Sequence, residues 1–92
     1  MTTPRFSLGK LVATPAALKA LERAGQSPTE FVSRHAAGDW GMVSPGDARL
    51  NDTAVASGER ILSAYVTRLA QRIWIITEAD RSSTCILLPE EY

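Results

Sequence analysis

The sequence has one cysteine, one histidine and no net charge, and each of these shortages argues against a class of protein. With Cys85 alone, the chain has neither a disulfide framework nor a thiolate cage for a metal ion. Its ten basic and ten acidic side chains cancel. The strong positive charge typical of proteins that hold a nucleic-acid backbone is therefore missing, which argues against nucleic acid as a partner.

Long hydrophobic runs are also missing. No stretch approaches the roughly 18 apolar residues that a membrane helix needs, and the start "MTTPRFSLGK" lacks the apolar run of a secretory signal. We therefore expect a cytoplasmic protein that does not contact the membrane. At 92 residues, of which 45% are hydrophobic and 22% charged, the chain has the composition of one small globular domain covering residues 1–92.

One local pattern occurs three times: Ser or Thr, then Pro, then a helical stretch that ends at or just before Gly. A hydroxyl at the N-cap accepts a backbone N–H, Pro at the first helical position wastes no donor, and Gly permits the left-handed cap. The pattern predicts short helices over roughly residues 15–24, 28–37 and 45–57. The third has the weakest apolar stripe, because Asn51 shares a face with Leu50 and Ala54.

From Ile61 onward the helical pattern gives way to β-branched and aromatic runs typical of strands, "ILSAYVT", "RIWIITE" and "TCILLP". In the middle run both faces are mostly apolar, with Ile73 and Ile75 on one side and Trp74 and Ile76 on the other. The short links between these runs permit only antiparallel hairpins, and "RFSLGKLV" could add an edge strand. The sequence thus predicts an α+β fold of three short N-terminal helices packed on a three- to four-stranded antiparallel sheet. The middle run is the expected central strand, and if Trp74 is a core residue, Trp74→Ala should cost roughly 3–5 kcal/mol.

His35 is the natural candidate for acid–base chemistry, because it is the only side chain that ordinarily titrates near neutral pH. A catalytic set would combine it with Glu78, Arg81 and Thr84, as in a metal-independent ribonuclease. The spacing of His35 from Phe31 and Val32 instead favours a histidine packed in the core. One histidine and scattered carboxylates match no metal-ligand pattern, and no nucleotide-binding or hydrolase motif occurs, so we expect neither metal nor cofactor.

Two polar stretches are candidate binding surfaces. In "GDWG", Asp39 and Trp40 lie between two glycines, so Trp40 would be either an exposed anchor for a partner or, as we favour, a ring folded over the helix–sheet seam. In "EADRSST", Asp80 and Arg81 are ordinary residues of a hairpin turn. Glu78 is the side chain that a turn does not require, so we regard Glu78 and Arg81 as contact residues first and catalytic residues second.

The stretches "ATPAALKAL", "AGQSP", "RHAAGDWG", "ILSAY" and "IWIITEADRSSTCILLPEEY", in this order, resemble a family of small uncharacterised bacterial proteins described as plasmid-related. Such proteins occur on plasmids, integrative elements and prophages. The resemblance covers nearly the whole chain and implies an accessory role in a mobile genetic element, with protein binding, directed against host defence, as the mode of action. It supplies no catalytic residues.

A second likeness, of architecture alone, is to compact ribonuclease toxins of the RelE and colicin style, which are usually strongly basic. Two hypotheses follow. The first, which we favour, is a non-enzymatic protein-binding module; the second is a metal-independent ribonuclease of RelE-like architecture. An exposed edge strand would also allow two copies to form a homodimer.

Overall fold

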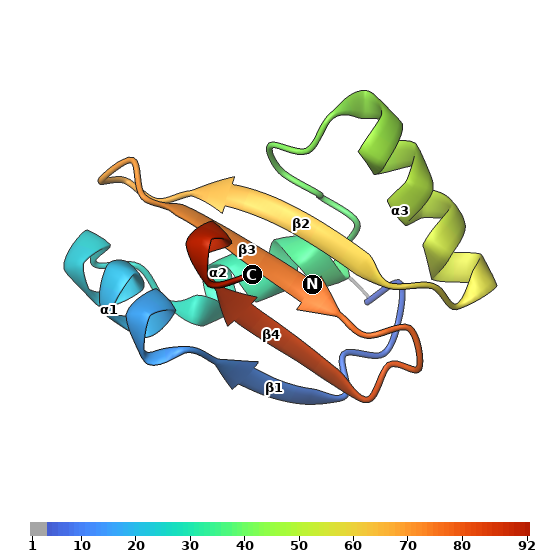
Figure 1. Cartoon of the computed structure of the whole chain (residues 1–92), viewed down its shortest axis with the longest axis horizontal. Helices are drawn as coiled ribbons and strands as arrows, with labels where there is room; N and C mark the ends of the chain where they lie inside the picture. The colour runs from blue at the N-terminus through green and yellow to red at the C-terminus, as the bar shows by residue number, and fades with distance from the viewer. Residues whose placement is uncertain (1–3) are drawn as a thin grey trace.

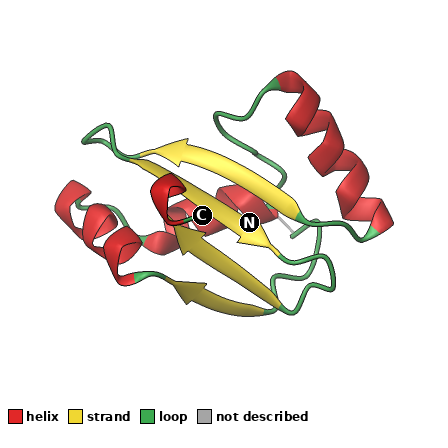
Figure 2. Ribbon diagram, in the orientation of Figure 1, coloured by secondary structure: helices red, strands yellow, loops and turns green. Residues whose placement is uncertain are grey.

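The computed structural model describes residues 4–92 and shows an α+β fold of three α-helices and a four-stranded sheet (Figures 1 and 2). One strand precedes the helices, so the expectation that the helices come first in the chain is wrong. In chain order the elements are β1 (Lys10–Ala13), α1 (Pro15–Ala24), α2 (Pro28–Ala36), α3 (Pro45–Ser57), β2 (Ile61–Val66), β3 (Arg72–Thr77), β4 (Ser83–Leu87) and the short 3₁₀ helix η1 (Pro89–Glu91).

The three helices begin where the Ser/Thr-Pro pattern predicts. The hydroxyls of Thr14, Ser27 and Ser44 accept hydrogen bonds from the backbone N–H groups of the first turns, and proline follows each cap. Gly25 and Gly58 adopt the left-handed conformation that ends α1 and α3. The predicted helix boundaries are confirmed to within one residue because they depend on these local caps.

The sheet is mixed, which corrects the prediction of a purely antiparallel sheet. Its strand order is β1-β4-β3-β2. The three C-terminal strands form antiparallel neighbours, as their short links require. The β1 strand pairs in parallel with β4, in the register Lys10↔Ser83 to Ala13↔Ile86. Three helices and two strands separate β1 from β4, so the connection is long enough for a parallel pair.

The two faces of the sheet differ in their cover. Helices α1 and α2 lie against one face, behind the sheet in Figure 1, whereas the short η1 lies on the other side, where the start of α3 borders the β2 edge. The main core lies under the helices, where Leu21, Phe31, Tyr65, Ile73 and Ile75 are almost completely buried. We call the opposite side the open face; its residues on β2 and β3 are Leu62, Ala64, Val66, Arg72, Trp74 and Ile76.

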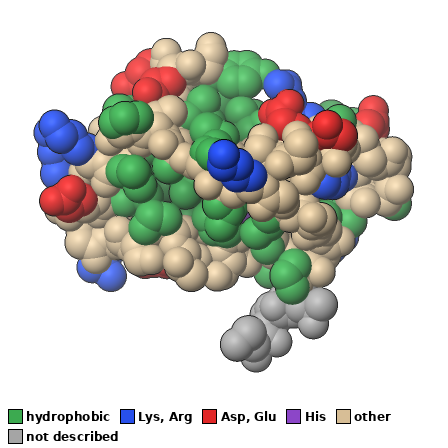
Figure 3. All heavy atoms as spheres, turned by 90° about the horizontal axis from the view of Figure 1, so that it is seen from below, with side chains coloured by type: hydrophobic (Ala, Val, Ile, Leu, Met, Phe, Trp, Pro, Cys, Tyr) green, Lys and Arg blue, Asp and Glu red, His purple; other side chains and the backbone are tan. Residues whose placement is uncertain are grey.

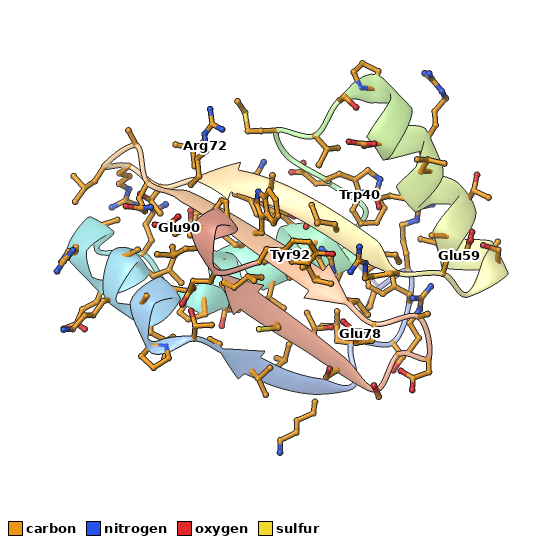
Figure 4. All side chains as sticks on the ribbon, viewed as in Figure 1. Trp40, Glu59, Arg72, Glu78, Glu90 and Tyr92 are labelled. Atoms are coloured by element: carbon orange, nitrogen blue, oxygen red, sulfur yellow. The ribbon has the colours of Figure 1, made fainter. Side chains whose placement is uncertain are left out.

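The position of Trp74 revises one expectation. The β3 strand is central, between β4 and β2, but the Trp74 side chain lies on the open face and is only partly buried. Its ring meets Tyr92 edge-on at 5.6 Å between ring centroids, and Figure 4 shows Tyr92 in front of the sheet. Trp74 is therefore not a residue of the helix-covered core.

Helix α3 packs beside β2 through a smaller cluster formed by Trp40, Ala54 and Ile61. The buried Asn51 fixes this helix to the strand: its amide donates to the Leu62 carbonyl at 2.8 Å and its oxygen accepts the Leu62 N–H at 3.3 Å. A polar residue on the inner face of α3 is thus satisfied by the edge of β2. Within residues 4–92, no helix has the length and apolar character needed to cross a membrane.

Candidate functional site

His35 lies on the inner face of α2 and is completely buried, as its helical spacing indicates. Both ring nitrogens have partners on the sheet. Nδ1 is hydrogen-bonded to the hydroxyl of Ser63 on β2, and Nε2 lies 2.8 Å from the hydroxyl of Thr77 on β3. The imidazole therefore joins α2 to two strands of the sheet.

The hydrogen bonds continue beyond His35. The Thr77 hydroxyl is 2.7 Å from the hydroxyl of Thr84 on β4, and Thr84 donates to the carbonyl of Leu8 at 2.7 Å. We call Ser63, His35, Thr77 and Thr84 the buried relay. All four residues are fully buried, and each has a hydrogen-bond partner.

The Leu8 carbonyl sets the direction of every proton in the relay, because a carbonyl can only accept. Thr84 donates its single proton to Leu8, so Thr77 must donate to Thr84. The Thr77 oxygen then accepts from Nε2–H of His35, which leaves Nδ1 as the acceptor of the Ser63 hydroxyl proton. The relay thus selects the neutral Nε2–H tautomer of His35.

The surroundings of His35 also favour its neutral form. Burial lowers its pKa from 6.5 to about 4, and the positive charge of Arg81 acts in the same direction. The rings of Phe6 and Trp40 meet the imidazole edge-on, at 5.3 and 5.9 Å between centroids. Aromatic contacts of this kind replace the water that a charged imidazole would need.

A serine hydroxyl that donates to a neutral imidazole is the arrangement that activates a nucleophile in hydrolases. Here, however, Ser63 and His35 are both at 0% exposure, so no substrate atom reaches either group in this conformation. The relay can hold α2 against the sheet and align it in register. It offers no chemistry to a dissolved ligand.

The structure brings together only part of the predicted catalytic set. His35 and Thr84 share the relay through Thr77, whereas Glu78 is exposed just beyond the end of β3 (Figure 4). Among residues 4–92, the Glu78 carboxylate makes no hydrogen bond or ion pair to His35 or Arg81. The set therefore does not converge on one point.

Arg81 has a structural role that its position in a turn does not reveal. Its guanidinium donates to the carbonyls of Ala54 and Glu59 at 2.7 Å each, and to the Glu78 carbonyl at 3.1 Å. It thereby ties the end of α3 to the β3–β4 turn. Arg81 is thus partly buried and bound to backbone carbonyls, so it does more than the ordinary turn residue that the sequence predicted.

The remaining turn residue follows the prediction. The Asp80 carboxylate accepts the Ser82 N–H at 3.0 Å, which is the usual role of aspartate in a turn. The Ser82 side chain, and then this backbone bond, lower the pKa of Asp80. Asp80 is exposed, so the carboxylate remains available to solvent.

The "GDWG" segment is a structural connection. Trp40 is 5% exposed and donates its indole N–H to Asp52 at 3.0 Å. Asp39 binds Arg34 at 2.7 Å and also accepts the Gly41 N–H, and the Arg34 bond holds the pKa of Asp39 below its usual range. The favoured interpretation, with Trp40 folded over the seam, matches this burial.

The same segment covers part of the outer edge of β2. The Met42 N–H donates to the Ala64 carbonyl at 2.7 Å, and the Ala64 N–H donates to the Trp40 carbonyl at 3.1 Å. Gly41 sits between them at φ +71°, where a Cβ atom would lie 2.0 Å from the Ala64 carbonyl oxygen. Only glycine fits this approach of the two backbones.

A hollow of about 340 Å³ opens between this segment, the start of α3 and the open face. We call it the open-face hollow. Its apolar lining includes Trp74, Val66 and Met42, and Met42 is 72% exposed. Arg72 and Asp47 place one charge of each sign on its lining. It differs from the relay because its side chains are accessible.

In the described part of the chain, no group of three or more His, Cys, Asp or Glu residues is placed to hold a metal ion. Cys85 faces the open side of β4 and is partly buried. Burial, with the negative charges of Glu91 and Glu78, raises the pKa of its thiol. A thiol in this environment is a poor nucleophile at neutral pH.

Sequence reasoning missed Ser63 and Thr77 as partners of His35. Both are polar residues at inward positions of apolar strands, and this break in the pattern was the available signal. Comparisons of the chain with protein-family models, with curated proteins and with solved structures find no match.

Proposed function

We propose that this chain is a non-enzymatic binding module that holds another protein in the open-face hollow. The exposure of Met42 at the mouth of an apolar hollow is the observation that carries the proposal. Methionine is flexible and polarisable, which suits a surface that adapts to a partner. Trp74 provides a broad aromatic wall of the kind that dominates binding energy in protein interfaces.

The charged side chains that line the hollow restrict which groups a partner can present. Arg72 and Asp47 lie among apolar side chains in the same hollow. A segment that presents an apolar side chain beside a carboxylate would fill the hollow and pair with Arg72. A partner without the apolar side chain would leave Trp74 and Met42 in contact with water and bind more weakly.

The ribonuclease hypothesis has less support. It requires His35 to exchange protons with RNA, but His35 is completely buried and both of its nitrogens are occupied. Glu78 and Arg81 do not join it, and the net charge of the chain is zero. We propose the mobile-element origin and the role against host defence on the basis of the sequence resemblance. They give the biological setting in which the binding would act.

The test is a comparative capture from bacterial lysate with the whole chain as bait. Met42→Glu places a charge at the mouth of the hollow and should remove at least about 90% of a specifically captured protein. Leu50→Glu is the matched control, because Leu50 is 68% exposed on α3 and does not line the hollow; this variant should capture as the parent does.

Two results would overturn the proposal. One is a partner that both variants retain equally, which would place the contact elsewhere. The other is degradation of RNA by the purified protein at micromolar concentration, provided that His35→Gln abolishes the degradation while the variant stays folded. That outcome would favour the ribonuclease hypothesis.

A further inference from the structure

Within residues 4–92, no strand pairs with the outer edge of β1. Toward β4, the N–H groups of Lys10 and Thr14 donate to the carbonyls of Ser82 and Ile86, both at 3.0 Å. Because successive residues of a strand alternate in direction, the backbone groups of Leu11 and Ala13 point away from the sheet. The described elements place no strand on that side, since β1 ends the strand order.

Apolar side chains flank this edge on both faces. Leu11 is 54% exposed and Val12 41% exposed. On the helix side, a groove of about 230 Å³ runs between β1 and α2 and is lined by Leu11, Val12, Ala13, Pro28, Thr29, Val32 and Ile86. Figure 3, which views the molecule from the β1 side, shows hydrophobic side chains gathered across this surface. The edge thus has unused backbone groups and an adjacent apolar groove.

We propose that β1 pairs antiparallel with β1 of a second copy of this chain, about a two-fold axis at Val12. In this register Leu11 of each copy exchanges backbone hydrogen bonds with Ala13 of the other, so the outward groups are the ones that bond. Val12 meets its own equivalent on the open face. Leu11 of the second copy then lies beside Ala13, on the side of the groove.

The charges of the edge support this occupant. The register places Lys10 opposite Thr14 of the second copy, and the Thr14 hydroxyl donates to the Glu91 carboxylate at 2.7 Å. The Leu88 N–H donates to the same oxygen at 2.8 Å, so the carboxylate is fixed beside Thr14. Lys10 and Thr14 are four residues apart, so their side chains lie on the same face of the sheet. The lysine therefore projects toward the Glu91 carboxylate of the second copy. The two-fold axis produces the Lys10–Glu91 pair twice.

A lysine on an edge strand can also serve to prevent pairing. If Lys10 had that role, its positive charge would meet no negative charge in a dimer, and replacing Lys10 would promote association. The proposed register predicts the opposite, because Lys10 meets a carboxylate of the other copy. The contact is short compared with a standard interface, which implies a concentration-dependent dimer. The proposed dimer contact is at the β1 edge of the sheet, and β2 forms the opposite edge. The dimer therefore does not depend on the open-face hollow.

The experiment is sedimentation equilibrium of the full chain over a range of concentrations from about 10 µM to about 1 mM. The average mass should rise from 10.0 kDa toward twice that value. Lys10→Glu should weaken dimerisation at least about tenfold, and Glu91→Gln, which keeps the hydrogen bonds to Thr14 and Leu88 but removes the charge, severalfold. Arg49→Glu on α3 is the matched charge control and should leave the dimer unchanged.

A second variant tests the strand pairing itself. Leu11→Pro removes an outward N–H that the folded monomer does not use, a position at which edge strands tolerate proline. It should abolish the dimer while the circular dichroism spectrum and the melting temperature stay close to those of the parent; Leu11→Ala retains the N–H and should leave part of the association. Any one of three results would overturn the proposal. They are a parent protein that stays at 10.0 kDa at every concentration, a Leu11→Pro variant that still dimerises, and a Lys10→Glu variant that associates more strongly than the parent.

Discussion

The two faces of the sheet are made by alternate residues of the same strands, yet several side chains of one face are accessible while those of the other are sealed. On β3, Ile73 and Ile75 are at 0% exposure under α1 and α2, whereas Trp74 between them is partly exposed beside Tyr92. Both faces are rich in hydrophobic side chains. The difference therefore arises from what covers each face, and hydrophobicity along the strand does not reveal it.

The comparison also separates polar residues that stabilise the fold from residues that can meet a partner. On the covered face, the polar groups of the buried relay are bonded to one another or to a backbone carbonyl, and the Tyr65 hydroxyl donates to the Asp39 carbonyl at 2.7 Å. On the open face, Arg72 lies in a hollow that solvent reaches. A buried and saturated polar group fixes the arrangement of the fold, and an accessible one is available for recognition.

The largest effect is expected for Ile75→Ala on the covered face. Ile75 is completely buried in the main core, so its truncation should lower the free energy of unfolding by about 3–4 kcal/mol through lost burial and the cavity left behind. Urea unfolding followed by circular dichroism measures this change. A loss under about 1 kcal/mol would show that the helices do not seal this face.

The relay should make stability depend on pH. His35 has a pKa of 6.5 when unfolded and about 4 when folded, so the unfolded chain binds its proton first as the pH falls. The contribution of neutral His35 to the free energy of unfolding is therefore fully present above pH 6.5. It decreases as the pH falls from 6.5 toward 4, by about 3 kcal/mol in total.

Urea unfolding at a series of pH values tests this dependence against the His35→Gln variant. Glutamine can donate and accept hydrogen bonds but does not titrate, so the pH-dependent difference between the two proteins isolates the histidine from the carboxylates. An equal slope for both proteins between pH 6.5 and 4 would mean that His35 is reached by water in the folded state.

The smallest effect is expected for Trp74→Ala, although tryptophan is the larger side chain. Because Trp74 is only partly buried and its ring contacts Tyr92 on the open face, we expect a decrease of about 1–2 kcal/mol in the free energy of unfolding. The same urea titration gives the value. A decrease of about 3 kcal/mol or more would equal that of a core truncation and would indicate that the open face is covered as well.

The elements of secondary structure could be predicted because their signals are local. A cap such as Ser44 with Pro45, or the β-branched and aromatic run "RIWIIT", acts within one turn or one strand. The pairing of β1 with β4 could not be predicted in this way, because no local residue states which of two distant strands lies alongside Lys10–Ala13. The assumption that all strands are antiparallel came from short links that join only the last three strands.

The candidate residues show the same limit. The spacing of His35 placed it on the inner face of α2, and that placement is confirmed. Its partners Ser63 and Thr77 are 28 and 42 residues away, and the carbonyls that bind Arg81 belong to α3 and two turns. Residues so far apart in the chain meet only when the sheet and helices assemble.

The sequence by itself determined where each helix begins and ends, which stretches become strands, and which of their residues face the same side, because these properties depend on neighbouring residues. Only the tertiary structure decided that one side of the sheet is closed over a neutral histidine while the other stays open beside Met42 and Trp74. The physical reason is that burial depends on which distant segment excludes water from a side chain, and that segment is selected by the packing of the whole chain.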